Sequence, residues 1–220
     1  MTEELLEQGN IESSVSYFQT FDFKHSSSVL DVGTRFGSFL MRLYQLGYRN
    51  LRGIDTDVDS IDKGRKAYPA LAPNLQHYGD AHLPFEGSQF DVVTAFDVIE
   101  HVPDVERFLR DIRRVLNPRG TFVFQTPNLL INVPKEVIYT KSLTAWRTYH
   151  CSLQTLFSLR QSLRQAGFSR IVVEKHQVCT EFNIAQSRQH LGGLGPPILR
   201  ILQALPLAAY PNFWGHAQNT

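Results

Sequence analysis

The chain has 220 residues, of which 42% are hydrophobic and 20% charged, as in an ordinary globular domain. Its 22 basic and 21 acidic side chains give a formal net charge of +1, which argues against a nucleic-acid partner because such proteins usually carry a basic excess. Cys151 and Cys179 show no zinc-binding spacing, so we expect a reducing, cytoplasmic setting. We expect neither a signal peptide nor a transmembrane segment, because the opening residues are polar and no run of about 18 apolar residues occurs.

Strand and helix patterns alternate through the first half of the sequence. Short apolar or β-branched runs predict strands, and longer runs with apolar residues every three or four positions predict helices. After a helical opening segment, Thr2–Phe21, the predicted strands are 29–32, 51–55, 75–78, 90–96 and 121–125, and the predicted helices are 37–46, 57–68 and 103–116. This alternation predicts an α/β fold with a mostly parallel sheet, which binds ligands at the carboxyl ends of its strands.

The second half of the sequence is less regular. Residues 127–150 have no clean period, and such long connections are often substrate loops or lids. A predicted helix over 153–165 and a predicted strand over 171–178 follow. Glycines and prolines at 192–197 then precede an apolar segment, Ile198 to Ala209, which is expected to pack on the surface or to form the interface of a homodimer.

We expect these elements to form one domain in four parts. Residues 1–27 form an N-terminal helical segment, and residues 28–126 form the ligand-binding core. Residues 127–150 form the substrate loop or lid. Residues 151–220 supply a C-terminal helix, a strand and the apolar segment that complete the same domain.

The first candidate site is the turn DVGTRFG, from Asp31 to Gly37. A strand ends there, two glycines allow a sharp turn and close approach of a ligand, and a helix begins. The free N–H groups and partial positive charge of a helix N-terminus attract a carboxylate or phosphate. The same pattern also occurs in a simple tight turn between a strand and a helix.

Two acidic residues follow the next predicted strands. Asp55 lies 22 residues after Gly33, where a carboxylate can accept hydrogen bonds from both ribose hydroxyls of a nucleoside. Asp80, in the run GDA, could accept a hydrogen bond from the exocyclic amine of an adenine. An aspartate in a turn is also common without any ligand.

The run DVIEH follows the fourth predicted strand and concentrates titratable groups. Asp97, Glu100 and His101 lie within five residues, where they could perform acid–base chemistry or bind a divalent metal. Alternatively, Glu100 and His101 form only local hydrogen bonds before the next helix.

Taken together, these motifs resemble those of the class I methyltransferases that use S-adenosylmethionine. The glycine turn, the acid after the second strand, GDA, FDVV with IEHV, and RRVLNPRGTFVFQTPN all occur in that family's order and spacing, over about residues 28–128. AGFSRIVV at 166–173 is similar to the family's entry into its antiparallel hairpin. Within the family, IEHV, TPN and the long loop that follows resemble the ubiquinone-biosynthesis O-methyltransferase subgroup.

The resemblance implies a fold and a set of cofactor contacts. The fold is a Rossmann-like three-layer α/β/α sandwich with a seven-stranded sheet of order 3-2-1-4-5-7-6, in which strand seven is antiparallel. Asp31, Gly33 and Gly37 would belong to the loop under the methionine moiety of S-adenosylmethionine. The other implied contacts are Asp55 to the ribose, Asp80 and Ala81 to the adenine, and Asp97 beside the methyl-transfer site.

The resemblance also implies a reaction, the transfer of a methyl group to a small-molecule acceptor, predicted at oxygen, with S-adenosylhomocysteine as product. His101 and, second, His150 are the candidate general bases. Some members of the subgroup hold a divalent metal such as Mg²⁺ with a cluster that Asp97, Glu100 and His101 match. Because EHV is also frequent in relatives with no known metal, we expect no metal.

Two departures from the family pattern lead to further expectations. Arg35 stands where the family usually has a glycine, so it either points away, meets the cofactor carboxylate or weakens binding. The usual glycine pair before strand five is Arg119-Gly120. Only the last few residues are left to supply strand seven, which we expect over Gly215–Thr220 and short, incomplete or disordered.

Other functions remain as alternatives. A catalytically degenerate cofactor-binding or interaction protein of the same fold would suit Arg35 and the short C-terminal end. A nicotinamide-dependent dehydrogenase is disfavoured because GTRFG lacks the GxGxxG pattern. A nucleic-acid methyltransferase is disfavoured because there is no basic excess and no Asn-Pro-Pro-aromatic run after the fourth strand.

Overall fold

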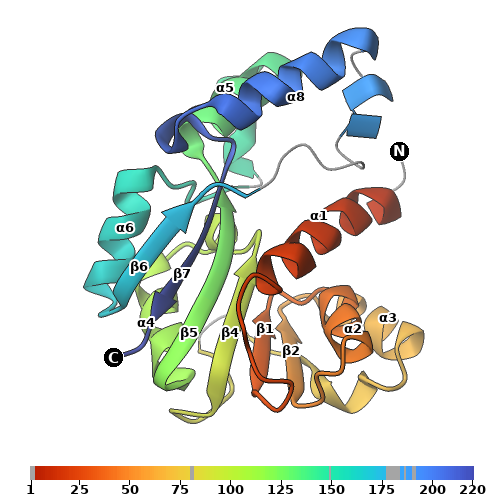
Figure 1. Ribbon diagram of the computed structural model, residues 1–220, viewed down its shortest axis with the longest axis vertical. Coiled ribbons are helices and arrows are strands. Elements are labelled where there is room, and N and C mark those ends of the chain that lie inside the picture. The colour runs from red at the N-terminus through yellow and green to blue at the C-terminus, as the bar shows by residue number, and fades with distance from the viewer. Residues whose placement is uncertain (1–2, 80–81, 149, 177–183, 186, 190–191) are drawn as a thin grey trace.

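Seven strands form one sheet in the order β3-β2-β1-β4-β5-β7-β6 (Figure 1). The computed structural model describes the chain except for residues 1–2, 80–81, 149, 177–183, 186 and 190–191. The first five strands run parallel, and β7 is antiparallel to both of its neighbours, which confirms the predicted architecture. The strands are β1 (Val29–Val32), β2 (Leu51–Asp55), β3 (Leu75–His77), β4 (Phe90–Phe96), β5 (Leu116–Pro127), β6 (Ser169–Glu174) and β7 (Asn212–Gln218).

Helices cover both faces of the sheet because side chains of a strand alternate between its faces. Along β5, Phe122 and Phe124 join one buried cluster with α4 and α6, whereas Val123 joins a second cluster with α1, α2 and α3. The covering helices are α1 (Glu3–Phe18), α2 (Ser38–Gln45), α3 (Val58–Ala67), α4 (Val105–Val115) and α6 (Leu156–Gln165).

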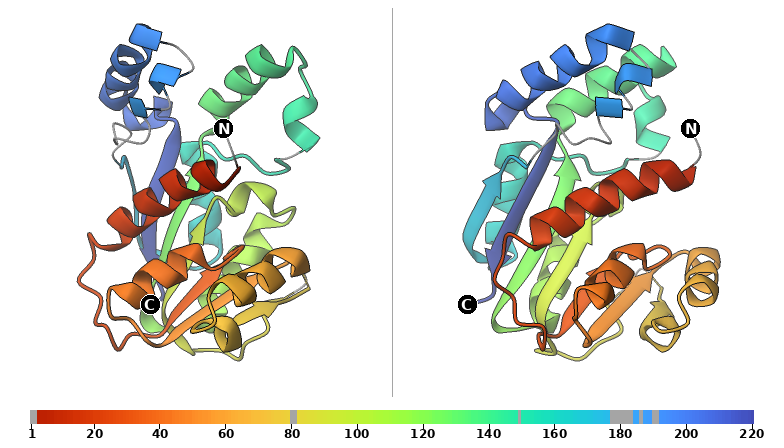
Figure 2. Two further views of the ribbon diagram at one scale, coloured as in Figure 1. Left: turned by 90° about the vertical axis from the view of Figure 1, so that its right-hand side faces the viewer. Right: turned by 45° about the vertical axis from the view of Figure 1, so that its right-hand side comes forward.

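Two helices instead extend beyond the carboxyl end of the parallel strands. They are α5 (Leu129–Thr140), which follows β5, and α8 (Gly195–Ala204), which precedes β7. The left view of Figure 2 shows that the two helices are separated from each other, although both lie at the same end of the molecule. The short 3₁₀ turns are η1 (Ala72–Asn74), η2 (Ile99–His101), η3 (Ala145–Thr148), η4 (Gly192–Leu194) and η5 (Leu207–Ala209).

The connection over 127–150 is more regular than its sequence pattern indicated. Asn128 is buried, and its side-chain oxygen accepts a hydrogen bond from Leu130 N at 3.1 Å, which caps α5 at its start. Pro134 lies inside this helix and obscures the helical signal in the sequence. The prediction of an irregular loop there was therefore wrong, although a lid role for the segment remains a prediction.

The last strand also differs from its prediction. β7 begins at Asn212 and pairs over seven residues with Thr121–Pro127 of β5, so the expectation of a short, incomplete or disordered strand over Gly215–Thr220 was wrong. Gly215 weakens the strand signal, but the structure requires it. A Cβ there would lie 2.5 Å from Phe124 Cζ and from Val172 O on the two neighbouring strands.

Smaller differences concern the ends of elements. Helix α4 begins at Val105, and its N-cap is Asp104, whose side chain accepts a hydrogen bond from Arg107 N. The helix predicted over 153–165 starts at Leu156, because Thr155 and Ser158 form a capping box. Strand β6 runs from Ser169 to Glu174, so the prediction of a strand through Lys175 and His176 was wrong, and the remainder of the predicted strand, 177–178, lies outside the described residues.

Asn219 anchors the segment after β7, and its removal tests how strongly. Its Nδ2 group donates to the carbonyl oxygens of Arg113, Leu116 and Asn117 at 3.2, 2.9 and 3.2 Å, where α4 ends and β5 begins. We predict that Asn219→Ala lowers the free energy of unfolding by about 1–2 kcal/mol, because these carbonyls lose a donor. Urea unfolding measures this.

The control for this measurement is Gln161→Ala, at an exposed position on α6. A surface substitution of this kind should change the free energy of unfolding by no more than about 0.5 kcal/mol. Equal losses in both variants would contradict the anchoring role of Asn219.

Candidate functional site

The turn after β1 depends on residues with left-handed backbone conformations. Gly33, Arg35 and Gly37 have φ angles of 75°, 51° and 82°. A Cβ on Gly33 would lie 2.4 Å from Val98 Cγ2, and one on Gly37 would lie 2.9 Å from Leu75 Cδ2. Glycine is therefore required at both positions for close packing as well as for φ.

Arg35 adopts a left-handed backbone conformation, which a residue with a side chain rarely adopts. Its guanidinium lies 4.8 Å from the centre of the Phe36 ring, within the range of a cation–π contact. Its backbone N–H donates to Asp55 Oδ2 at 2.7 Å. The arginine thus fits the turn without displacing the backbone from β2.

Asp55 stands at the end of β2 and joins two loops. Besides the bond from Arg35, its Oδ1 accepts a hydrogen bond from Asp57 N at 2.9 Å. Asp57 itself caps α3, which was predicted to begin at this residue. Since each carboxylate oxygen has two lone pairs, Asp55 can still accept two hydrogen bonds from a ligand.

Asp31 occupies a different environment from Asp55. It is 4% exposed, pairs within the sheet, and accepts a hydrogen bond from Thr94 Oγ1 at 2.6 Å. Burial raises the pKa of its carboxyl to about 7, and the hydrogen bond from Thr94 opposes this rise. The structure places Asp31 beneath the glycine turn, in the interior of the sheet.

A cleft of about 760 Å³ opens at the carboxyl ends of β1 to β4. This volume lies within the usual range for small-molecule sites. The cleft brings together residues that the sequence placed far apart, and its walls include Gly33, Asp55, Tyr78, Gly79, Val98 and His101. Asp80 and Ala81, the predicted adenine contacts, lie outside the described residues.

Beside this cleft, Glu100 and His101 meet His150 from the connection after β5. The ring centres of the two histidines are 5.1 Å apart, and His101 Nε2 lies 3.9 Å from Glu100 Oε1. The His101 side chain is half exposed, whereas that of Glu100 is 2% exposed and accepts a hydrogen bond from Thr126 Oγ1 at 3.0 Å. Both histidines predicted as bases therefore lie at one place.

Ser152 holds this arrangement together, and sequence patterns gave no sign of its role. Its Oγ donates to the carbonyl oxygens of Ile99 and Val102 at 2.9 and 2.5 Å, and its N–H donates to Glu100 O at 3.0 Å. These bonds fasten the segment after His150 to the turn η2. They explain how two histidines 49 positions apart become neighbours.

The protein environment sets the charges of this group. Burial, with repulsion from Asp97, raises the pKa of Glu100 to about 8, so its carboxyl is mainly protonated at pH 7. Burial and the neighbouring His101 lower the pKa of His150, against the opposing charge of Glu136.

Asp97 lies beside this group, at the end of β4. Although solvent reaches Asp97, the protein packed around its carboxyl raises its pKa, and Gln125 and His101 oppose the rise. Its backbone also has a left-handed φ of 55°, and its N–H donates to Gln125 O and Oε1.

The residues that could bind a metal differ from Asp97, Glu100 and His101, the three that the sequence indicated. Among the described residues, Glu100, His101 and His150 can direct one ligand atom each to within 4.8 Å of one another. Asp97 is not part of that group. These three residues could hold a divalent cation through one carboxylate and two imidazoles.

Comparison with known proteins identifies a family and several similar chains. A family model described as a methyltransferase domain matches residues 7–173. The chain is 33% identical over 102 residues to a probable S-adenosylmethionine-dependent methyltransferase of Mycolicibacterium smegmatis, covering 44% of this chain and 39% of the relative. It is 35% identical over 94 residues to the sarcosine/dimethylglycine N-methyltransferase of Halorhodospira halochloris, covering 43% of this chain and 33% of the relative.

A solved structure shows the same fold over almost the whole chain. It is the complex between the Haloferax volcanii Trm112 methyltransferase activator and a methyltransferase, with a TM-score of 0.74 at 16% identity. The superposition covers 97% of this chain and 92% of the other. By contrast, the matched segment spans only about two fifths or less of the length of the two curated relatives.

The close approach of Gly33 and Val98 gives a prediction about stability. We expect Gly33→Ala to lower the free energy of unfolding by about 2–4 kcal/mol, because the new Cβ is overpacked against Val98 and the backbone is left-handed. Thermal and urea unfolding measure the loss.

The double variant Gly33→Ala/Val98→Ala separates the two causes. Its loss should be smaller than the sum of the losses of the two single variants, because the clash disappears with the valine methyl groups. Strictly additive losses would show that the contact does not restrict residue 33.

Proposed function

Because this chain belongs to the S-adenosylmethionine-dependent methyltransferase family, we propose that it transfers a methyl group from that cofactor to an oxygen atom of a small-molecule acceptor. The family model covers most of the chain. The acceptor and the atom that is methylated are our own inference, and they rest on the group formed by Glu100, His101 and His150.

The cleft beside the glycine turn has the features that this cofactor needs. Gly33 is exposed and lines this cleft, so a ligand in the cleft can reach its backbone. Asp55 retains two lone pairs for the ribose hydroxyls, since backbone N–H groups use only one on each oxygen. These two observations support Gly33 and Asp55 as cofactor-binding residues.

When bound, S-adenosylmethionine supplies an activated methyl group on a sulfonium centre. The protein then has to position the acceptor in line with that methyl group and exclude water. An acceptor hydroxyl must also lose its proton as the new C–O bond forms. An amine that is already neutral needs no base before it attacks, so a paired-imidazole site favours an oxygen acceptor.

His101 is suited to accept that proton. It lines the cleft and its side chain is half exposed, so an acceptor can reach it. The proton of the acceptor hydroxyl would pass to a ring nitrogen of His101, while the methyl group leaves sulfur for oxygen. The products are a methylated oxygen, S-adenosylhomocysteine and a protonated imidazole.

Glu100 and His150 would act through His101 as positioning residues. The lowered pKa of His150 keeps that ring neutral, so it does not repel the charge that develops on His101. Glu100 lies 3.9 Å from His101 and gains a negative charge only near pH 8. Its ionisation would stabilise the protonated imidazole and make the base stronger.

Cofactor binding is the first test of this function. We predict that the wild type binds S-adenosylhomocysteine and that Asp55→Ala raises its Kd at least about tenfold, since a hydrogen bond to a charged group contributes about 1.5–3 kcal/mol. Titration calorimetry measures both values. An acceptor screen with phenols and catechols, with and without Mg²⁺, follows.

Asp62→Ala is the matched control for this test, because Asp62 is exposed on α3 and is not among the residues that line the cleft. Its Kd should equal that of the wild type. If the folded wild type binds no cofactor, the chain is a degenerate member of its family and the proposed reaction is wrong.

Kinetics test the base. We predict that His101→Gln lowers kcat by about 10²–10⁴-fold with little change in the Kd of S-adenosylhomocysteine, as expected for a general base. In the wild type, kcat should rise with pH through about 8 as Glu100 ionises, and Glu100→Gln should lack that rise.

His25→Gln is the matched control for the kinetic variants, because His25 is exposed and packs on Tyr48, outside the cleft-lining residues. It should leave kcat unchanged. A full rate for His101→Gln would rule out His101 as the base.

A further inference from the structure

Among the described residues, the part of the molecule that extends beyond the sheet consists of 129–148, 184–185, 187–189 and 192–209, and we call it the α5/α8 lobe. It is charged differently from the rest of the chain. Five of the 22 basic and one of the 21 acidic side chains belong to it, which gives it a net charge of +4 and leaves −3 for the remaining sequence. Its basic residues are Lys135, Lys141, Arg147, Arg188 and Arg200.

The lobe is also unusually apolar on its surface. Of the nine large hydrophobic residues that are exposed in the described part of the chain, five lie in the lobe. Among them, Leu143, Leu194 and Ile201 are 80%, 71% and 64% exposed. The other two are Leu130 and Ile198.

Helix α8 is fixed at its ends and open along its length. At its start, Gly195 packs closely against Ser187, and at its end Lys175 Nζ donates to the carbonyl oxygens of Gln203 and Leu205. Gly195 is the helix's one buried residue, although the helix contains Ile198, Leu199, Ile201 and Leu202. Leu199 and Leu202 are half-buried, whereas Ile198 and Ile201 face solvent, and exposed apolar side chains grouped on one helix indicate a partner.

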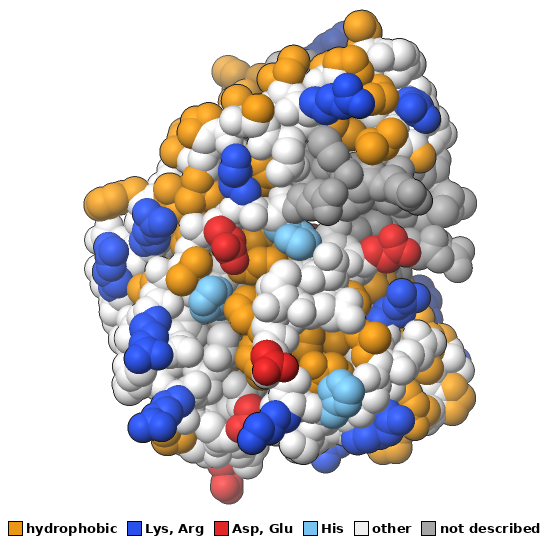
Figure 3. Space-filling view, in the orientation of Figure 1, with side chains coloured by type: hydrophobic (Ala, Val, Ile, Leu, Met, Phe, Trp, Pro, Cys, Tyr) orange, Lys and Arg blue, Asp and Glu red, His pale blue; other side chains and the backbone are white. Residues whose placement is uncertain are grey.

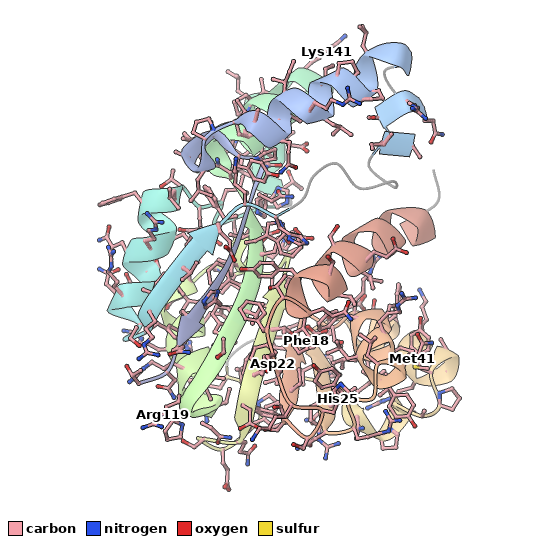
Figure 4. All side chains as sticks on the ribbon, in the orientation of Figure 1. Phe18, Asp22, His25, Met41, Arg119 and Lys141 are labelled. Carbon is pink, nitrogen blue, oxygen red and sulfur yellow. The ribbon has the colours of Figure 1, made fainter. Side chains whose placement is uncertain are left out.

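The figures place both features on the same end of the molecule. Figure 3 shows apolar and basic side chains together over α8, and no acidic side chain there in that view. Figure 4 shows Lys141 at this end, whereas Arg119 and His25 lie at the opposite end. The one acid of the lobe, Glu136, acts on His150 of the candidate site.

We propose that the α5/α8 lobe binds the surface of an anionic lipid bilayer. Exposed aliphatic side chains flanked by lysine and arginine characterise segments that lie in the bilayer interface. The basic residues would meet the acidic headgroups, and the leucines and isoleucines would enter the boundary of the acyl chains.

The geometry of α8 defines the mode of binding. Its 10 residues span about 15 Å, half of the roughly 30 Å of a hydrocarbon core. Among the residues that the structure describes, no helix is long and apolar enough to cross a membrane. The lobe would therefore lie on the bilayer surface.

Two other occupants fit these observations less well. A second copy of the chain would bring two lobes of charge +4 together, and their repulsion opposes self-association. A nucleic acid would use the basic residues, but exposed leucine and isoleucine offer nothing to phosphates or base edges.

Vesicle flotation tests the proposal. The wild type is mixed with vesicles of phosphatidylcholine alone or with phosphatidylglycerol added. We expect it to float with the anionic vesicles, and to float less at high salt because salt screens the headgroup attraction. We expect Ile198→Ser/Ile201→Ser to lower the partition coefficient at least about tenfold, because it removes most of the apolar area of two side chains.

Matched variants separate lipid binding from general damage. Lys141→Gln/Arg200→Gln should weaken binding to anionic vesicles, whereas Arg119→Gln, at the opposite end of the molecule, should not. Val58→Ser, at a position on α3 that is 49% exposed, serves as the apolar control. Circular dichroism and thermal unfolding show whether each variant is folded.

Several results would overturn the proposal. The first two are the absence of flotation and an equal loss of vesicle binding in the lobe and control variants. The others are a dimer in light scattering that only the Ile198→Ser/Ile201→Ser variant dissociates, and binding to RNA in place of vesicles. None of these measurements requires a cofactor or an acceptor. A failure here is therefore distinguishable from a failure of the proposed methyl transfer.

Discussion

The carboxyl end of the sheet depends on one carboxylate, that of Asp55. One of its oxygens holds the backbone of the turn after β1, through the N–H of Arg35, and the other holds the start of α3, through the N–H of Asp57. The turn after β1 and the loop that leads from β2 into α3 are thereby both fixed to the end of β2. The same side chain retains free lone pairs that face the cleft, so the group that orders the loops is also available to a ligand.

This double role explains how an arginine is accommodated in the glycine turn. A left-handed φ costs a residue with a side chain roughly 1–2 kcal/mol. At Arg35 the bond from its N–H to Asp55 and the contact of its guanidinium with Phe36 offset that cost. The turn keeps its shape because contacts with Asp55 and Phe36 offset the cost of the left-handed backbone. A comparison of motifs does not consider such contacts.

Local signals in the sequence predicted the core of the fold well. Val29–Val32, Leu51–Asp55 and Phe90–Phe96 form strands with the predicted bounds, because short β-branched runs between clear turns leave few alternatives. β7 was missed as a full strand because Gly215 weakens its pattern, while its need for glycine comes from Phe124 and Val172 on other strands.

In the candidate site, too, some residues could be predicted from local sequence patterns, whereas others depend on contacts between distant parts of the chain. Asp55 follows directly from its distance to Gly33, whereas the meeting of His101 with His150 depends on Ser152 and its bonds to a turn some 50 residues earlier. Asp31 lies in the predicted motif but is buried, since its strand is covered on both sides. A pattern of residue types gives the order of groups along the chain, and only packing decides which of them face a ligand.

The position of β7 has a consequence for the order in which the molecule can be assembled. β6 precedes β7 in the chain, yet among the described strands of the sheet it pairs only with β7, which in turn pairs with β5. During synthesis, β6 has no partner until α8 and β7 have both emerged. Until then the edge of β5 is an unpaired template beside exposed apolar side chains. The pairing of β6 with β7, which are far apart in sequence, is therefore expected to be the slow step in folding. Before that step, the chain is most exposed to aggregation.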